Sequence, residues 1–330
     1  MQMMRPLASR LLGPFRVLPF LLPVSAALAQ TDTSALQWLQ RIYTATQKLS
    51  YTGVFVYQQG QQVETSRITH IVEASGPRER LETLDGIPRE IIRTRDQVVC
   101  YLPASMTVKI DKQSGTRMFP AILPERLKEL AENYSIRKGE VERVGGYDCQ
   151  VIILEPRDRM RYGHRLWADL NTGMLLKAKT FDEKNEMLEQ FAFTHLQIGG
   201  SIDRAQLKTR FSRASRDWRV EDSGATRTNL AEAGWTIRSS PPGFRTVTEL
   251  LRTLGGTSGV GHIVLSDGLA AISVFIQPAK SKQPASQPGL VRQGAINVYM
   301  RPVGDYWVTV VGEAPPESVK YVADAVEYRK

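Results

Sequence analysis

The stretch Tyr51-Thr-Gly-Val-Phe-Val-Tyr57 decides the fold class, because its side chains have the character and the spacing of a β-strand. Aromatic and β-branched residues favour strands, and the turn-forming sequence Gln58-Gln-Gly60 ends the run. Successive side chains of a strand point to opposite faces. Apolar groups stand on both faces here, which leaves two readings open: a filled core, or an incompletely filled barrel that admits an acyl chain.

Strands of the same kind follow at short spacing, with polar or glycine-containing turns between them. A meander without helical crossovers predicts one antiparallel sheet. A twisted sheet of about ten strands tends to curl on itself, so we expect a curled sheet before residue 200. The predicted strands are residues 63–72, 79–84, 90–94, 98–102, 107–112, 135–144, 148–155, 165–170, 175–182 and 187–198.

Two helices are expected to cover one face or the mouth of this sheet. The first spans about 34–49, where Trp38, Ile42 and Ala45 recur at helical spacing. The second spans about 124–133.

The character of the chain changes after Gly199. Residues 204–229 are rich in arginine and poor in apolar residues, which is typical of a linker. Residues 230–330 predict a small α+β domain with its own core. We expect a short helix at 248–254, hairpins through Asp267-Gly268 and at 296–311, a mobile loop at 279–289 and a closing helix at 318–328.

The first 29 residues have the pattern of a secretory signal peptide: a basic head, a short apolar run and an Ala-x-Ala end. We predict cleavage between Ala29 and Gln30, which leaves 30–203 as the larger domain. The chain has two cysteines, Cys100 and Cys149, and in an oxidising compartment an even count favours a disulfide between them. Two separate buried thiols are the alternative.

The net charge and the lack of catalytic motifs predict a binding protein. The formal net charge is +9, which suits an anionic lipid headgroup or an acidic partner, and nucleic acid is not expected outside the cytoplasm. The chain has no nucleophile elbow, zinc-binding His-Glu-x-x-His motif or phosphate-binding loop. We therefore expect no catalytic residues, no metal site and no cofactor, and the chain is predicted not to be an enzyme.

Four stretches carry a resemblance to a known family. They are residues 53–57, 64–68, 79–92 and 235–244, and the most specific piece is Leu84-Asp-Gly-Ile-Pro-Arg-Glu90. They resemble the MucB/RseB regulators of Gram-negative bacteria. The resemblance implies a LolA-like unclosed β-barrel with covering helices, followed by a smaller α+β domain that is the main dock for a membrane anti-sigma factor of the MucA or RseA type.

The resemblance also implies a function. Proteins of this family are periplasmic, protect the anti-sigma factor from regulated proteolysis and keep an envelope-stress sigma factor silent; in pseudomonads this pathway controls alginate production. We expect the partner to contact aromatic side chains of the small domain, namely Trp235, Phe244, Tyr299 and Trp307. An acyl-chain lipid such as lipopolysaccharide is expected to bind with its head on the linker arginines Arg210, Arg213 and Arg216. A periplasmic lipid or lipoprotein carrier is the alternative function, and a homo-oligomer stays open.

Overall fold

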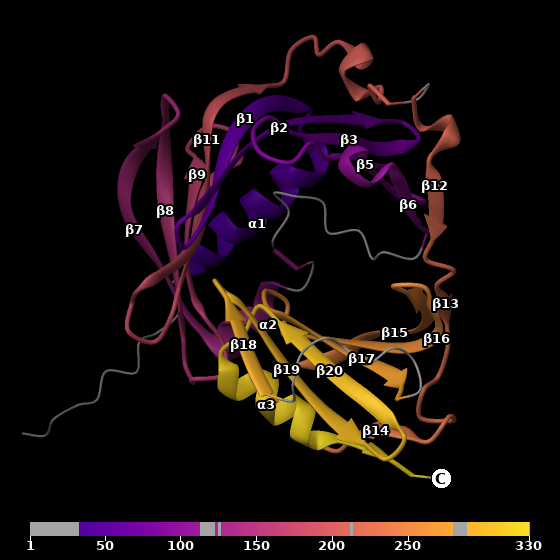
Figure 1. The fold of residues 1–330 in the computed structure, drawn as a ribbon. Helices are drawn as coiled ribbons and strands as arrows, with labels where there is room; N and C mark the ends of the chain where they lie inside the picture. The colour runs from indigo at the N-terminus through magenta and orange to yellow at the C-terminus, as the bar shows by residue number, and fades with distance from the viewer. Residues whose placement is uncertain (1–32, 113–122, 125–126, 212–213, 280–288, 330) are drawn as a thin grey trace, which may run out of the picture. The chain divides into compact units, whose positions relative to one another are not determined.

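The structure is a computed structural model, and it describes residues 33–112, 123–124, 127–211, 214–279 and 289–329. Residues Thr31–Lys330 form one compact unit, which holds two main sheets (Figure 1). The predicted signal peptide and its cleavage site at Ala29 and Gln30 lie outside the described residues, as does most of the loop predicted at 279–289. In the part of the chain that is described, no helix is long and apolar enough to span a bilayer.

The large sheet has twelve strands in the order β12-β6-β5-β4-β3-β2-β1-β11-β10-β9-β8-β7, and its ends do not pair with each other. All neighbouring strands are antiparallel except β12 and β6. The strands are β1 (Tyr51–Gln59), β2 (Gln62–Glu73), β3 (Gly76–Thr83), β4 (Glu90–Arg93), β5 (Val98–Leu102), β6 (Thr107–Asp111), β7 (Tyr134–Val144), β8 (Tyr147–Pro156), β9 (Gly163–Asp169), β10 (Leu175–Phe181), β11 (Met187–Ile198) and β12 (Arg219–Asp222). This is the unclosed antiparallel barrel that the sequence and the resemblance predicted.

Two helices pack on the inner face of this sheet, α1 (Thr33–Lys48) and α2 (Leu127–Asn133). The inner face carries Tyr51, Phe55 and Tyr57 of β1. This strand lies between β2 and β11, and the residues that pair with these three point to the same face. Leu39 and Ile42 of α1 are fully buried against this face. Tyr51, Phe55 and Tyr57 therefore belong to the main core, whereas Val54 and Val56 lie half-buried on the other face.

The small sheet has seven strands in the order β13-β15-β16-β17-β20-β19-β18. The strands are β13 (Thr226–Arg227), β15 (Arg245–Leu254), β16 (Thr257–Ser266), β17 (Ala271–Pro278), β18 (Gly289–Gln293), β19 (Ile296–Val303) and β20 (Tyr306–Gly312). Helix α3 (Pro316–Ala325) packs on β19 and β20, and β14 (Trp235–Ile237) pairs with β21 (Val326–Tyr328). The helix expected at 248–254 is wrong, because this segment belongs to β15 and pairs with β16, with one register shift between Arg252 and Leu254.

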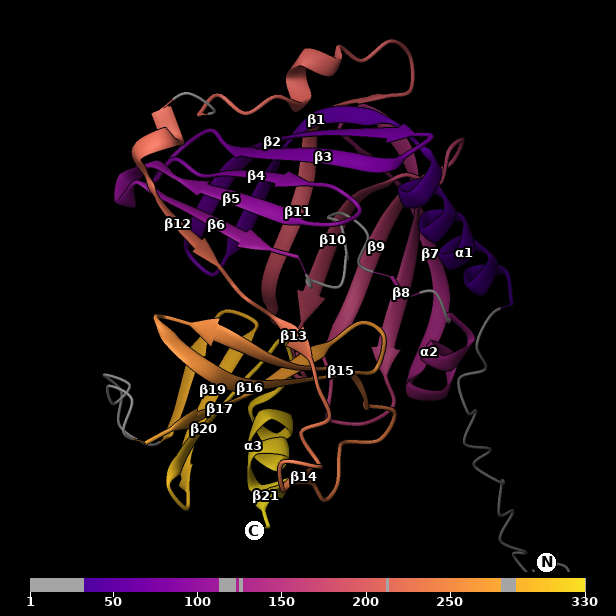
Figure 2. The ribbon, with the colours of Figure 1, turned by 90° about the vertical axis from the view of Figure 1, so that its right-hand side faces the viewer.

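The linker is tied to both sheets. A short 3-10 helix, η2 (Arg204–Leu207), lies against β2 and β3, and Leu207 is buried there. The chain then supplies an edge strand to each sheet, β12 beside β6 and β13 beside β15 (Figure 2). The sequence did not predict these strands, because their partners lie far away along the chain.

The expected disulfide is also wrong in this structure, which holds Cys100 and Cys149 as free thiols. Cys100 lies on β5 and Cys149 on β8, and the sheet order places seven other strands between them. A disulfide needs the two Cα atoms to lie within about 7 Å of each other. Strands β5 and β8 are not neighbours in the sheet, so they do not bring the two cysteines this close. Burial raises the pKa of the Cys149 thiol to about 12.

Candidate functional site

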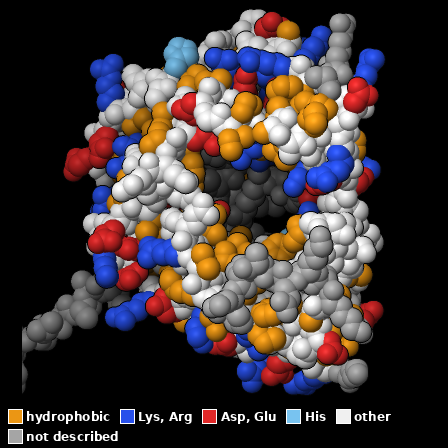
Figure 3. All heavy atoms as spheres, in the orientation of Figure 1, with side chains coloured by type: hydrophobic (Ala, Val, Ile, Leu, Met, Phe, Trp, Pro, Cys, Tyr) orange, Lys and Arg blue, Asp and Glu red, His pale blue; other side chains and the backbone are white. Residues whose placement is uncertain are grey.

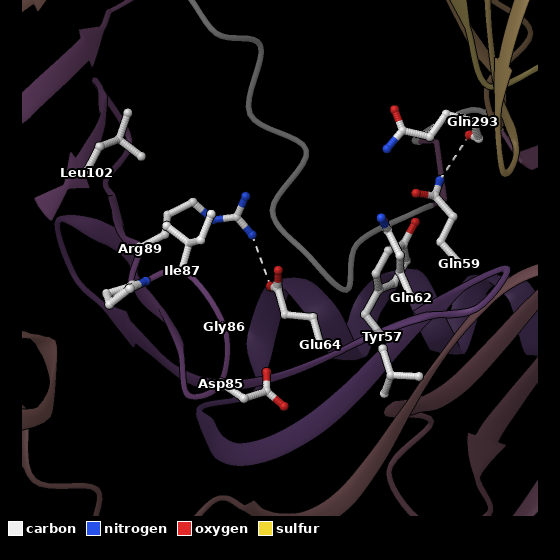
Figure 4. A pocket seen from close by; sticks show the side chains of 12 residues that line it. Tyr57, Gln59, Gln62, Glu64, Asp85, Gly86, Ile87, Arg89, Leu102 and Gln293 are labelled. Carbon is white, nitrogen blue, oxygen red and sulfur yellow. Dashed lines mark hydrogen bonds and ion pairs between the residues drawn. The ribbon is translucent and has the colours of Figure 1, made fainter. Parts of the chain in front are cut away.

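A cavity of about 920 Å³ opens at one end of the inner face of the large sheet (Figure 4). The end of β1, the start of β2, the loop between β3 and β4, the end of β5 and the end of β18 all contribute to its wall. In the space-filling view, hydrophobic side chains gather around a central hollow (Figure 3). The residues that line the cavity are Tyr57, Gln59, Gln62, Val63, Glu64, Asp85, Gly86, Ile87, Pro88, Arg89, Leu102 and Gln293.

Two residues of the loop at 84–89, Asp85 and Gly86, fix its conformation. The carboxylate of Asp85 accepts a hydrogen bond of 2.7 Å from the backbone N–H of Thr65, which lowers the pKa of Asp85. Gly86 has a φ of 76°, a left-handed conformation that favours glycine. The Asp-Gly sequence is typical of a two-residue hairpin turn. The structure instead has a six-residue loop between Thr83 and Glu90, and most of it lines the cavity.

The charged centre of the cavity is an ion pair between the last residue of this loop and a residue of β2. Arg89 Nη2 lies 3.0 Å from Glu64 Oε1, and both side chains are partly exposed, so the pair contributes little stability. Glu64 also accepts hydrogen bonds from Ser66 and Thr83. Of the described lining residues, Arg89 is the only basic one. It is therefore the cation that an anionic group in the cavity would meet.

A row of polar side chains runs from the cavity across four strands of the inner face. The hydroxyl of Tyr57 donates to Glu189 Oε2 at 2.6 Å, and Thr180 Oγ1 donates to Glu189 Oε1 at 3.2 Å. Thr180 also lies 3.4 Å from Nδ1 of His164. Burial and the carboxylate of Glu189 raise the pKa of Tyr57, and burial lowers the pKa of His164 to about 4. Tyr57 and His164 are thus neutral at pH 7. Glu189 accepts hydrogen bonds from both Tyr57 and Thr180 and so links these two side chains.

The inner face is filled at one end and hollow at the other. Leu127 and Leu130 of α2 join α1 in covering β7, β8 and β10. The cavity lies away from these helices, where Ile87, Pro88 and Leu102 supply apolar surface and three glutamines supply amide groups. Such a wall can hold a ligand with both apolar and polar parts.

The predicted aromatic contacts divide into two groups. Trp235 and Phe244 are 5% and 4% exposed and belong to the core of the small domain. Their burial corrects their expected role as anchors for a partner. Tyr299 and Trp307 are half-buried, so part of each side chain is accessible.

Of the predicted linker arginines, neither Arg210 nor Arg216 lines the cavity. Arg210 pairs with Glu82 at 2.7 Å, on the face of the sheet opposite to Glu64 and Tyr57. Arg216 is exposed in the short helix η3 (Ala214–Asp217), and Arg213 lies outside the described residues. Arg210 therefore joins the linker to the sheet through Glu82, and its contact with a lipid head stays a prediction. Sequence reasoning missed Arg89 as the cavity cation, although it stands in the family-specific stretch at 84–90.

Two family models match the chain: the MucB/RseB N-terminal domain over residues 34–211 and the MucB/RseB C-terminal domain over residues 229–327. The sigma factor AlgU regulatory protein MucB of Pseudomonas aeruginosa is 31% identical over 304 residues, which covers 90% of this chain and 92% of that protein. The sigma-E factor regulatory protein RseB of Escherichia coli K12 is 24% identical, over 88% of this chain and 89% of that protein.

Solved structures agree with this likeness. A crystal structure of MucB in complex with MucA(peri) has a TM-score of 0.68 and 29% identity, and the match covers 90% of this chain and 99% of that one. Another structure, a crystal structure of MucB, has a TM-score of 0.67. From the matched domains and this near end-to-end similarity, the chain belongs to the MucB/RseB family.

Proposed function

We propose that this protein is a periplasmic regulator that binds the periplasmic part of a membrane anti-sigma factor of the MucA type and protects it from regulated proteolysis. The observation that carries the proposal is the similarity to MucB over almost all of both chains, in a structure where MucB is bound to MucA(peri). Both domains of the family are present in the family's order. The relatives are named as regulators, which supports a role without catalysis.

We further propose that the cavity holds the signal, an amphiphile with an acyl chain and an anionic head such as lipopolysaccharide. Ile87, Pro88 and Leu102 offer apolar surface for the chain, and Arg89 offers a positive charge for the head. A ligand weakens binding of the anti-sigma factor only if it prefers the unbound arrangement of the protein. Gln293 belongs to the small domain and lines the cavity, so a ligand there contacts both domains.

The experiment is a titration of the purified chain with the periplasmic domain of the anti-sigma factor, without lipid and then with lipopolysaccharide below its aggregation threshold. Binding without lipid, and weaker binding with it, is the expected result. Arg89→Ala should bind the anti-sigma domain normally and respond less to lipid, and Arg143→Ala, an exposed arginine on β7, is the matched control. No binding by the lipid-free chain would contradict the proposed function.

The periplasmic location has its own test. Intact-mass analysis of the protein from a periplasmic extract should give a chain that begins at Gln30. A mass that retains Met1, or a chain recovered only with the cytoplasmic fraction, would contradict this part of the proposal.

A further inference from the structure

The two main sheets end in four edge strands, and three of these edges are protected against pairing with another chain. Exposed edges invite further strands, and proteins usually block them with charges or by keeping the strand short. β7 exposes mainly charged side chains, among them Arg137, Lys138, Glu140, Glu142 and Arg143. β12 has four residues, three of them charged, and β13 has only two residues.

The fourth edge, β18, is different. Its neighbouring residues Leu290 and Val291 are 48% and 55% exposed. β18 pairs with β19 on one side, and among the described residues no strand pairs with its other side. Leu290 and Val291 point to opposite faces of the sheet, because side chains alternate along a strand. Apolar surface therefore borders the open edge on both faces.

We propose that β18 is a docking edge on which an extended segment of the anti-sigma factor adds as a further strand. This inference rests on the proposed function and names how the partner is held. The open backbone edge presents N–H and C=O groups at strand spacing, and only another extended backbone satisfies them in register. The alternate side chains of the added strand would then cover Leu290 on one face and Val291 on the other.

The position of β18 connects this edge with the cavity. Its last residue, Gln293, lines the cavity, and its backbone oxygen accepts a hydrogen bond of 3.3 Å from Gln59. β18 stands at the end of the small sheet in Figure 1, and Figure 4 shows Gln293 opposite Gln59 and Gln62. The amide groups of these glutamines can bind the backbone of a peptide that runs past the end of β18. A ligand in the cavity and a strand on β18 therefore meet at Gln293.

The test places a charge on the open edge. Val291→Glu should weaken binding of the anti-sigma factor's periplasmic domain by about tenfold or more, because the carboxylate would lie beside the apolar side chains of the added strand and lose part of its hydration. Val141→Glu is the matched control, since Val141 is 53% exposed on the edge strand β7. We expect Val141→Glu to bind within about twofold of the unchanged protein. Leu290→Glu repeats the test on the other face.

A second measurement asks where the partner lies. Backbone amides of residues 289–293 should exchange with deuterium more slowly in the complex than in the free chain, while those of 137–143 should not change. Thermal unfolding of each variant shows that it is folded.

The outcomes separate this inference from the function on which it rests. If the unchanged protein binds the anti-sigma domain and Val291→Glu binds it equally well, the docking edge is wrong and the proposed function stands. Equal weakening by Val291→Glu and Val141→Glu would also overturn it, as would a change in self-association without a change in partner affinity. If the unchanged protein does not bind the anti-sigma domain, the proposed function itself fails.

Discussion

Arg161 Nη1 lies 2.6 Å from Oδ2 of Asp267, and neither side chain has exposed area. Arg161 precedes β9 of the large sheet, and Asp267 lies in the turn between β16 and β17 of the small sheet. The hydroxyl of Tyr134 also donates to Asp267, at 3.2 Å, and Arg161 donates to the backbone oxygen of Pro242. This buried cluster joins the two domains, so an arrangement that separates them has to break it.

Removing one member of this pair should be costly. Asp267→Asn removes one of the two carboxylates beside the buried guanidinium of Arg161, while Asp158 stays at 3.0 Å. We expect a loss of about 1–3 kcal/mol in the free energy of unfolding, the usual cost of a lost hydrogen bond between charged groups. Urea unfolding measures this loss. Asp324→Asn is the control, because its pair with Lys320 is half exposed, and it should leave the unfolding midpoint unchanged. Equal midpoints for Asp267→Asn and the unchanged protein would contradict the role of the cluster.

Gly53 is a second position where the structure allows little change. A Cβ atom there would lie 2.6 Å from the backbone oxygen of His195, so β1 or β11 must shift. We expect Gly53→Ala to destabilise the protein by about 1–3 kcal/mol in thermal or urea unfolding. Gly163→Ala on β9 is the matched control, since the added Cβ would lie 3.5 Å from its nearest neighbours, which is ordinary contact.

Stability should fall on mild acidification. Burial, and then the charge of Arg252, lowers the pKa of His262 from its ordinary 6.5 to about 4, and Asp111 opposes this shift. The folded state therefore disfavours the charged ring, and the stabilising effect is complete above pH 6.5 and is lost as the pH falls towards 4. For one such group the loss is at most about 3 kcal/mol. Urea midpoints between these pH values should fall less in His262→Gln, and an identical pH dependence would contradict the assignment.

The two thiols should react at different rates and independently of each other. Cys100 is half-buried and Cys149 is fully buried, so a thiol reagent should label Cys100 in the folded protein and Cys149 only after unfolding. Reductant should not change the unfolding midpoint. Labelling of neither thiol in the unfolded, unreduced protein would show a disulfide and contradict the structure.

The sequence predicted best where local pattern and tertiary structure agree. The helical spacing of Trp38, Ile42 and Ala45 predicted a helix at 34–49, and α1 spans Thr33–Lys48. The alternating strands from Tyr51 to Ile198 also appear nearly as expected, because tight turns and β-branched residues set their limits. The closing helix was placed at 318–328, whereas α3 ends at Ala325 and the chain pairs with β14 from Val326.

The misses share a physical cause, which is dependence on distant partners. Thr248 to Leu254 has too few residues for its spacing to separate helix from strand, and pairing with β16 decided the outcome. The edge strand β12 exists only because β6 lies beside it. The same holds for the site: Arg89 and Gln293 stand about two hundred residues apart in sequence, and only the fold brings them to one cavity.

The most direct test of the whole account is the rate at which the anti-sigma factor's periplasmic domain is cut by its envelope protease in the presence of a saturating amount of this protein. The account predicts a strong slowing of cleavage, with recovery when lipopolysaccharide is added. An unchanged cleavage rate, under conditions where binding is shown to be saturated, would contradict it.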